Sequence, residues 1–307
     1  MSPIRDDIER ARRFSRRLLP YDPQAPVPPP LPSGALVVVP NRGEMFVRLS
    51  EGPKDAIPVL LLHGWTVSAD LNWFRVYQAL GQHHPVVAVD HRGHGRGIRD
   101  ERKFTLEDCA DDAAALLDVL GMEQVIAVGY SMGGPISLLM AQRHPAKVGG
   151  LVCQATALEW RGSRWERLVW RVMSVFEFTS RAVSNRSLLR RAMRQAIDDS
   201  PDLEPFRAWL LGEFRRGNPS DIADAGRALA DYDARPFAST IGKPAAVVIT
   251  TRDRAVRRKK QEALATALGA QRFEIAADHD VCLVRPHEFA KVTLDAVGSV
   301  AARIRPG

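Results

Sequence analysis

The chain has 307 residues, of which 45% are hydrophobic and 26% charged, and this composition excludes a fibrous or disordered protein. Its formal net charge is +7, and residues 157–194 hold nine arginines against three glutamates, a local excess of +6. The positive charge is therefore concentrated in one segment. Because no recognised nucleic-acid-binding module accompanies it, this charge supplies only a nonspecific field, and we expect no specific nucleic-acid partner.

The three cysteines indicate the compartment. Cys109, Cys153 and Cys282 form no close pair and no metal-ligand spacing, and an odd number argues against a disulfide framework. The N-terminus lacks the apolar core of a signal peptide, and no stretch approaches the ~18 apolar residues of a membrane span. We expect a cytoplasmic protein that uses neither a metal nor a cofactor.

The first 34 residues are predicted to lie outside the main domain. Residues 1–20 show apolar side chains at helical spacing with arginines between them, which is typical of a basic amphipathic helix. Seven prolines from Pro20 to Pro32 then predict an extended linker. The helix has two interpretations: it packs on the main domain, or it lies on an anionic membrane surface.

Strand-like apolar runs alternate with helical patterns from residue 35 onward. We expect eight strands, at Leu36–Val39, Met45–Leu49, Pro58–Leu62, Pro85–Val89, Val125–Tyr130, Gly150–Cys153, Ala245–Thr250 and Arg272–Ala276. Helical patterns lie at Leu71–Leu80, Leu106–Leu120, Pro135–Gln142, Arg257–Leu268 and His287–Arg303. Apolar strands separated by helices predict an α/β fold with a mostly parallel sheet covered on both faces. The turn at residues 40–43 predicts an antiparallel hairpin for the first two strands, at one edge.

Residues 157–235 interrupt this alternation, because they contain helical patterns and no convincing strand. We interpret them as a helical cap inserted into a core of residues 35–156 and 236–307. Trp160, Trp165 and Trp170 recur in its first helix among arginines. They indicate either a cap core with a solvated arginine face, or a wall that binds an acyl chain or faces a lipid surface.

The segment from Val125 to Gly134, VIAVGYSMGG, contains the most informative motif of the chain. A buried strand pattern ends in Gly-X-Ser-X-Gly and continues into a helix, which is the context of a nucleophile elbow. Only residues without bulk at Gly129 and Gly133 allow the two arms of such a turn to approach closely. Ser131 is therefore the candidate nucleophile, and the Met132 N–H is directed at the position where an oxyanion would form.

A serine hydroxyl needs a base within hydrogen-bond reach and a carboxylate that orients that base. Asp253 follows the seventh predicted strand, and His279 follows the eighth. Because the active-site groups of parallel sheets gather at the carboxyl ends of the strands, we expect both residues to converge on Ser131. Asp231 and Asp233 are rivals for the acid, but they precede the seventh strand.

The chain order of serine, acid and base, together with the elbow motif, resembles the α/β-hydrolase family from residue ~35 to the end. In that family the loop after the third strand commonly begins with His-Gly, and here it reads His63-Gly64-Trp65. The resemblance implies that the Trp65 N–H is the second oxyanion donor beside Met132.

Residues 90–95, DHRGHG, also resemble a turn of this family, and the resemblance implies that Asp90 and Arg92 brace the active-site loops. Two departures from the family pattern concern the acid and the base. The usual glycine before the acid is missing from residues 250–253, and Asp278 stands before the base where glycine is commoner.

A serine at the nucleophile position points to acyl transfer and disfavours the aspartate-dependent epoxide hydrolases and haloalkane dehalogenases of the family. We expect a cofactor-independent serine hydrolase of the carboxylesterase or lipase type, acting on a small-molecule ester through an acyl-enzyme. The same three residues in this family also serve cofactor-free perhydrolysis of the haloperoxidase kind and carbon–carbon bond hydrolysis. A non-enzymatic ligand receptor is a third alternative.

Overall fold

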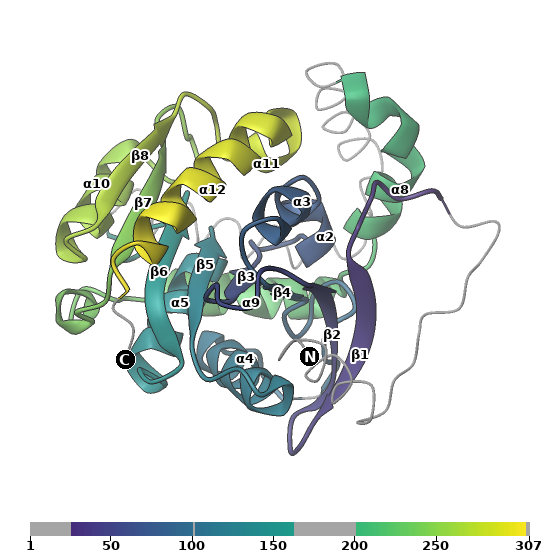
Figure 1. Cartoon of the computed structure of the whole chain (residues 1–307), viewed down its shortest axis with the longest axis horizontal. Helices are drawn as coiled ribbons and strands as arrows, with labels where there is room; N and C mark the ends of the chain where they lie inside the picture. The colour runs from purple at the N-terminus through teal and green to yellow at the C-terminus, as the bar shows by residue number, and fades with distance from the viewer. Residues whose placement is uncertain (1–25, 101, 163–200, 305–307) are drawn as a thin grey trace.

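The structure is a computed structural model that describes residues 26–100, 102–162 and 201–304. Its centre is an eight-stranded sheet with the order β1-β2-β4-β3-β5-β6-β7-β8 (Figure 1). The strands are β1 (Ser33–Val39), β2 (Gly43–Ser50), β3 (Val59–Leu62), β4 (Val86–Val89), β5 (Val125–Tyr130), β6 (Val148–Gln154), β7 (Ala245–Thr250) and β8 (Gln271–Ile275). Strand β2 runs antiparallel to β1 and β4, and the other neighbouring pairs are parallel. The predicted mostly parallel α/β sheet is confirmed.

The hairpin at one edge of the sheet forms where the turn residues permit it. Asn41 and Gly43 have φ angles of 62° and 123°, and both residue types tolerate positive φ better than most. The two strands then pair from Val39 with Gly43 to Ser33 with Leu49. The hairpin predicted from the turn at residues 40–43 is therefore confirmed.

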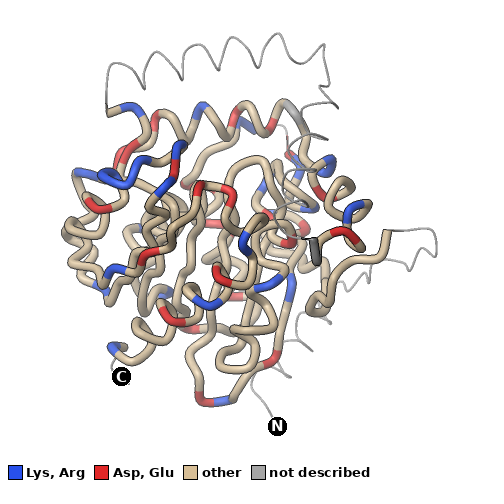
Figure 2. Tube along the Cα trace, turned by 90° about the horizontal axis from the view of Figure 1, so that it is seen from above, with Lys and Arg blue, Asp and Glu red and all other residues tan. Residues whose placement is uncertain are grey.

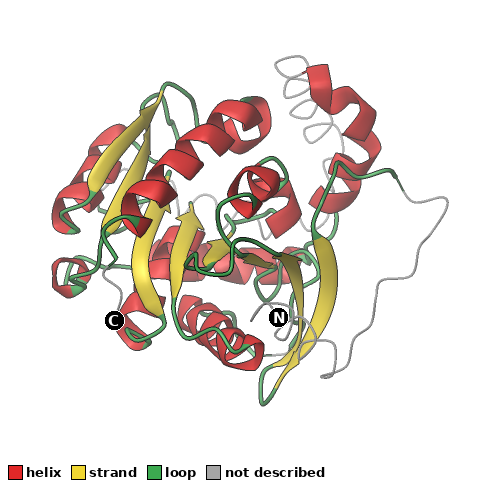
Figure 3. Ribbon diagram, viewed as in Figure 1, coloured by secondary structure: helices red, strands yellow, loops and turns green. Residues whose placement is uncertain are grey.

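Helices cover both faces of the sheet (Figure 3). They are α2 (Ala69–Trp73), α3 (Val76–Gly81), α4 (Leu106–Leu120), α5 (Gly133–Arg143), η1 (Pro201–Phe206), α8 (Arg207–Phe214), α9 (Pro219–Asp231), η2 (Ala238–Thr240), α10 (Arg258–Ala267), α11 (Val281–Val284) and α12 (Pro286–Ala301). Successive strand residues point to opposite faces. Leu61 and Val248 pack with α2, α3, α11 and α12, whereas Leu60 and Val247 pack with α4, α5 and α10.

The prediction of one helix at Leu71–Leu80 was wrong, because the chain forms α2 and α3 there with a break between them. Both residues in the break contact the segment that follows β6. Phe74 meets Trp209 edge-on, with 6.1 Å between the ring centroids, and the Arg75 guanidinium lies 5.9 Å from the centre of the Phe206 ring. We attribute the interruption to these tertiary contacts, which override the local helical periodicity.

We keep the name cap segment for residues 157–235, which lie between β6 and β7. Its described part contains η1, α8 and α9. Trp160 is buried, but it lies in a bend beside the bridge between Glu159 and Asp233, so the prediction that it belongs to a helix was wrong. Helices α8 and η1 contribute to an apolar cluster with Leu71 of α2, while Leu229 of α9 joins the cluster beneath α4. The cap segment therefore makes apolar contacts with the core at two places, at α2 and beneath α4.

Several predicted features lie outside the described residues. They are the N-terminal helix of residues 1–20 and the part of the cap segment that contains Trp165 and Trp170. Along the described trace, basic and acidic residues are interspersed (Figure 2). None of the helices that the structure describes is long and apolar enough to cross a membrane.

Candidate active site

Ser131 lies in a strained turn between β5 and α5. Its φ angle is +51°, in the left-handed region that a residue with a side chain seldom adopts. Its N–H donates to the Gln154 carbonyl at the end of β6, at 2.9 Å. A Cβ at Gly129 would lie 2.1 Å from the Gly133 carbonyl oxygen, and one at Gly133 would lie 2.0 Å from the Leu62 carbonyl oxygen. Neither glycine position has room for a side chain.

The three residues predicted to form the reactive group lie in series, and His279 contacts both of the others. His279 Nε2 is 3.0 Å from Ser131 Oγ, and His279 Nδ1 is 2.8 Å from Asp253 Oδ2. The Asp253 side chain is fully buried, whereas 28% of the His279 side chain is exposed. With Nδ1–H donating to the carboxylate, the Nε2 lone pair faces the serine hydroxyl, so the geometry permits proton transfer between them.

Asp253 is held in one orientation by bonds from its own loop. Its Oδ1 accepts from the N–H groups of Ala255 at 2.8 Å and Val256 at 2.7 Å. Its Oδ2 accepts from the Thr250 hydroxyl at 2.7 Å as well as from the imidazole. The turn that lacks the family's usual glycine is thus closed by hydrogen bonds to the carboxylate itself.

The two rival carboxylates have other partners. Asp231 lies 2.9 Å from the Arg161 guanidinium, and Asp233 lies 2.6 Å from that of Arg235. Neither of them contacts the histidine that follows β8. Among the described residues, Asp253 is therefore the carboxylate at the imidazole.

Two contacts that the sequence did not reveal connect the loop after β8 to its neighbours. The Tyr130 hydroxyl donates to the His279 carbonyl. Asp278 Oδ1 accepts from the N–H groups of Arg254 at 2.9 Å and His279 at 2.8 Å, and its Oδ2 accepts from the Arg254 guanidinium. Asp278, which stands where glycine is commoner, therefore joins the loop after β7 to the loop after β8. Its position was visible in the sequence, but its partner across the two loops was not.

The loop after β3, residues 64–68, approaches Ser131 closely. A Cβ built on Gly64 would lie 3.3 Å from the serine Cβ. The Gly64 N–H donates to Asn72 Oδ1 at 2.9 Å. Thr66 has a φ angle of +68°, which is strained for a β-branched residue. Strain of this kind persists only where surrounding contacts over-determine the backbone, and it is common at functional sites.

The two predicted oxyanion donors belong to elements that meet at the serine. Met132 follows Ser131, is the N-cap residue of α5 and has a buried side chain. Trp65 lines the cavity that contains Ser131, and its indole Nε1–H donates to the Ile222 carbonyl of α9 at 2.7 Å. Met132 therefore adjoins the serine along the chain, and Trp65 lines the same cavity as the serine.

Three buried histidines adjoin the 64–68 loop. The ring centroid of His63 lies 4.3 Å from that of His91 and 5.5 Å from that of His94. His63 Nε2 accepts from the His91 N–H at 3.0 Å. Burial is the main cause that lowers the pKa of His63 well below its usual value, that of His91 to about 3 and that of His94 to about 4. The cluster is therefore uncharged at neutral pH.

Asp90 and Arg92 brace the loops, as the resemblance implied. Asp90 accepts from the N–H groups of Ala69 and Arg96, each at 2.7 Å. Arg92 donates two bonds of 2.8 Å to Asp112. Burial raises the pKa of Asp90 to about 6. Neither residue contacts Ser131: Asp90 holds the backbone at residues 69 and 96, and Arg92 joins the loop after β4 to α4 through the Asp112 side chain.

A cavity of about 390 Å³ opens beside Ser131. Its apolar wall includes Trp65, Val67, Ala255 and Leu283. The volume and the apolar lining are typical of a site for a small organic molecule. In the part of the chain that the structure describes, no cluster of three histidine, cysteine or acidic side chains could hold a metal ion.

A parallel sheet with a strained serine after β5, a carboxylate after β7 and a histidine after β8 defines the α/β-hydrolase class. The chain belongs to the alpha/beta hydrolase fold family, whose sequence model matches residues 57–286. The family resemblance inferred from the elbow and from the order of the three residues is thereby confirmed.

Similar proteins carry several different activities in their names. The putative carbamate hydrolase RutD of Caulobacter vibrioides is 37% identical over 109 residues, 35% of this chain and 40% of that protein. The non-heme chloroperoxidase of Streptomyces lividans is 34% identical over 103 residues, 33% of this chain and 37% of that protein. The chain thus spans less than half the length of these relatives. An esterase from Exiguobacterium antarcticum shares the fold, with a TM-score of 0.72 and 18% identity over 85% of this chain and 98% of that chain.

Proposed function

We propose that the protein is a serine hydrolase that cleaves carboxylic esters through an acyl-enzyme intermediate. The observation that carries this proposal is the continuous contact from Asp253 to His279 at 2.8 Å and from His279 to Ser131 at 3.0 Å. The serine at the end of this series has the φ angle of a nucleophile elbow, +51°. Acyl transfer by such a group requires no cofactor.

The first half of the reaction forms the acyl-enzyme. Ser131 Oγ attacks the ester carbonyl carbon while His279 Nε2 accepts the hydroxyl proton, and Asp253 stabilises the imidazolium. The N–H groups of Trp65 and Met132 donate to the oxyanion of the tetrahedral intermediate. The imidazolium then gives its proton to the leaving alcohol, and the acyl group remains on the serine.

The second half of the reaction releases the acid. A water molecule attacks the acyl carbonyl while His279 Nε2 accepts one of its protons, and the same proton returns to Ser131 Oγ as the ester bond breaks. The 28% exposure of the His279 side chain gives water access to this position.

The apolar wall of the cavity supports a substrate with a small or medium apolar acyl group. A carbamate, which the name of one relative mentions, also has a carbonyl that Ser131 would attack in this way. Perhydrolysis is a second candidate, supported by the similarity to the non-heme chloroperoxidase. In that reaction hydrogen peroxide would replace water in the second half.

The test is hydrolysis of p-nitrophenyl esters from acetyl to palmitoyl by the wild type, by Ser131→Ala and by Ser299→Ala. Ser299 is the matched control, because its hydroxyl only donates to the Ala296 carbonyl within α12. We expect Ser131→Ala to lower kcat by at least ~10⁴-fold with the fold intact, and Ser299→Ala to leave it unchanged. An unaltered rate in Ser131→Ala would refute the proposal, and turnover that requires peroxide would favour perhydrolysis.

A further inference from the structure

The 64–68 loop contacts the cap segment at both of its ends. On one side, the Trp65 Nε1–H donates to the Ile222 carbonyl in α9 at 2.7 Å. On the other side, the Ser68 hydroxyl donates to Glu213 Oε2 in α8 at 2.9 Å. The loop that carries a proposed oxyanion donor is therefore attached to two helices of the cap segment.

Ser68 also bonds to the backbone of α2, which follows the loop. It is the N-cap residue of α2, and its Oγ accepts from the Leu71 N–H at 3.3 Å. The N–H of the next residue, Ala69, donates to Asp90 Oδ1 at 2.7 Å. Because the hydroxyl hydrogen goes to Glu213, the oxygen lone pairs remain available to cap the helix. The start of α2 is thus held by one carboxylate from the core and one from the cap segment.

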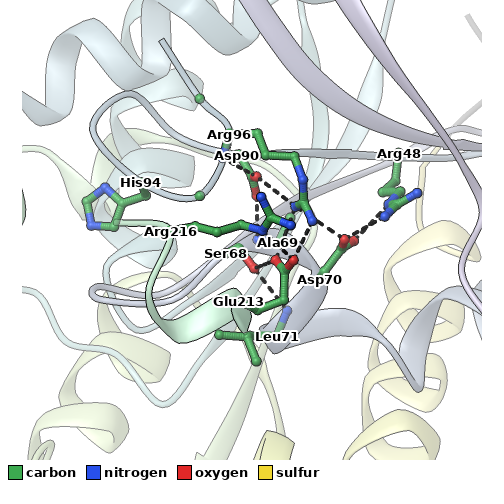
Figure 4. A network of polar contacts seen from close by, with 12 residues as sticks. Arg48, Ser68, Ala69, Asp70, Leu71, Asp90, His94, Arg96, Glu213 and Arg216 are labelled. Atoms are coloured by element: carbon green, nitrogen blue, oxygen red, sulfur yellow. Dashed lines mark hydrogen bonds and ion pairs between the residues drawn. The ribbon is translucent and has the colours of Figure 1, made fainter. Parts of the chain in front are cut away.

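Glu213 is a buried charge among opposite charges (Figure 4). The residue is 2% exposed. Arg96 donates to both of its carboxylate oxygens, and Arg216 Nε lies 2.6 Å from Oε1. Arg96 also lies 3.4 Å from Asp70 and 3.6 Å from Asp90. A buried carboxylate is tolerated only when it is paired in this way, so the network defines one position for α8 on the core.

We infer that Glu213 is a positioning residue, which holds the 64–68 loop and its Trp65 N–H in the geometry that stabilises the oxyanion. This inference rests on the proposed function. The carboxylate acts through Ser68 and the start of α2 and does not touch the substrate. Misplacement of a reacting or stabilising group by about 1 Å costs up to ~100-fold in rate. Because the oxyanion exists only after attack, loss of this contact lowers kcat and leaves KM nearly unchanged.

The test compares Glu213→Gln with Glu204→Gln. Glu204 is the matched control, because it lies in the same cap segment, pairs with Arg207 at 2.6 Å and has a 54% exposed side chain. The first readout is kcat and KM for the best p-nitrophenyl ester, with kcat expressed per serine titrated by a fluorophosphonate. The second readout is hydrogen–deuterium exchange of the backbone amides of residues 65–71, which requires no turnover.

We expect Glu213→Gln to lower kcat roughly 10- to 100-fold and to change KM less than ~3-fold. Amide exchange over residues 65–71 should become at least ~10-fold faster, because a neutral side chain at position 213 weakens both the bond to Ser68 and the ion pairs that hold α8 against the start of α2. Glu204→Gln should match the wild type in both measurements. Ser68→Ala leaves the ion pairs of Glu213 intact but removes the N-cap of α2 together with the bond to Glu213, so it should shift both readouts in the same direction. If Glu213→Gln does not fold, the kcat and KM of Ser68→Ala test whether the start of α2 positions the 64–68 loop.

The inference is overturned if Glu213→Gln and Ser68→Ala turn over like Glu204→Gln, or if exchange over residues 65–71 is unchanged. A purely structural role would lower the number of titratable serines without lowering kcat per serine, and that result would also overturn it. A wild type that hydrolyses no ester would refute the proposed function, while the exchange comparison would still decide whether Glu213 holds the loop.

Discussion

The core and the cap segment near the active site are held in place by different forces. On the core side, Ser131 follows a buried strand, and steric exclusion at Gly129 and Gly133 together with a bond to Gln154 fixes its turn. On the cap side, the Glu213 carboxylate is paired with the guanidinium groups of Arg96 and Arg216. The core side thus depends on close backbone packing, and the cap side depends on the pairing of a buried charge.

This difference predicts that the two sides fail under different perturbations. Close-packed backbone has no free volume to accept another atom, so the core side is sensitive to added size. A buried ion pair leaves an uncompensated charge when one partner is removed, so the cap side is sensitive to lost charge. Variants that change only size or only charge can therefore separate the two contributions.

The largest effect is expected from a methyl group at the elbow. Gly133→Ala would place a Cβ 2.0 Å from the Leu62 carbonyl oxygen, so the backbone must shift or the chain fails to fold. We expect the free energy of unfolding to fall by more than about 4 kcal/mol. Gly298→Ala, in α12 with no atom outside the backbone of its own helix within 4 Å of the added Cβ, should raise it by roughly 1 kcal/mol. Urea unfolding measures both, and a wild-type stability in Gly133→Ala would contradict the steric account.

The next effect concerns charge on the cap side. Arg96→Met removes the cation shared by Asp70, Asp90 and Glu213, and we expect a loss of about 3–5 kcal/mol in the free energy of unfolding. The control is Arg258→Met, which breaks exposed pairs and should cost less than about 1 kcal/mol. Urea unfolding of the two variants side by side gives the comparison. Equal losses would show that burial does not strengthen the network.

The smallest effect is an acid sensitivity of the core side. His63, His91 and His94 have pKa values below the ~6.5 of histidine in an unfolded chain. The unfolded chain therefore binds more protons as the pH falls below ~6.5, and stability is lost from there toward the folded-state pKa values. Asp90 acts in the opposite sense, because burial raises its pKa to about 6 and protonation relieves its buried charge.

Together, the three histidines and Asp90 should lower the free energy of unfolding by about 2 kcal/mol between pH 6.5 and 5.5. Urea unfolding at closely spaced pH values measures it. A free energy that stays level or rises over this interval would show that the histidines are not held neutral in the folded chain.

The sheet could be predicted from the sequence because its strands are continuous apolar runs, and Val125–Tyr130 and Ala245–Thr250 form the strands predicted for them. The break between α2 and α3 could not be predicted, because Phe74 and Arg75 contact aromatic rings of the cap segment, which lies far along the chain. Local periodicity carries no information about such partners.

The same distinction applies to the candidate site. Ser131, Asp253 and His279 could be placed because parallel strands present their carboxyl ends at one edge of the sheet. Glu213 could not, because its bond to Ser68 joins residues 145 positions apart and no motif marks either residue. The role of Asp278 could not be predicted either, because it depends on the loop after β7 and the loop after β8 lying side by side.

Whether Ser131 is the nucleophile is tested most directly by peptide mass spectrometry after reaction with a fluorophosphonate, applied to the wild type and to Ser131→Ala. We expect one adduct per chain in the wild type, on the peptide that contains Ser131, and none in the variant. The basis of this expectation is the 3.0 Å contact between Ser131 Oγ and His279 Nε2, because a neighbouring base raises the nucleophilicity of a serine hydroxyl. An unlabelled wild type, or an adduct on a different residue in both proteins, would contradict the assignment of the nucleophile.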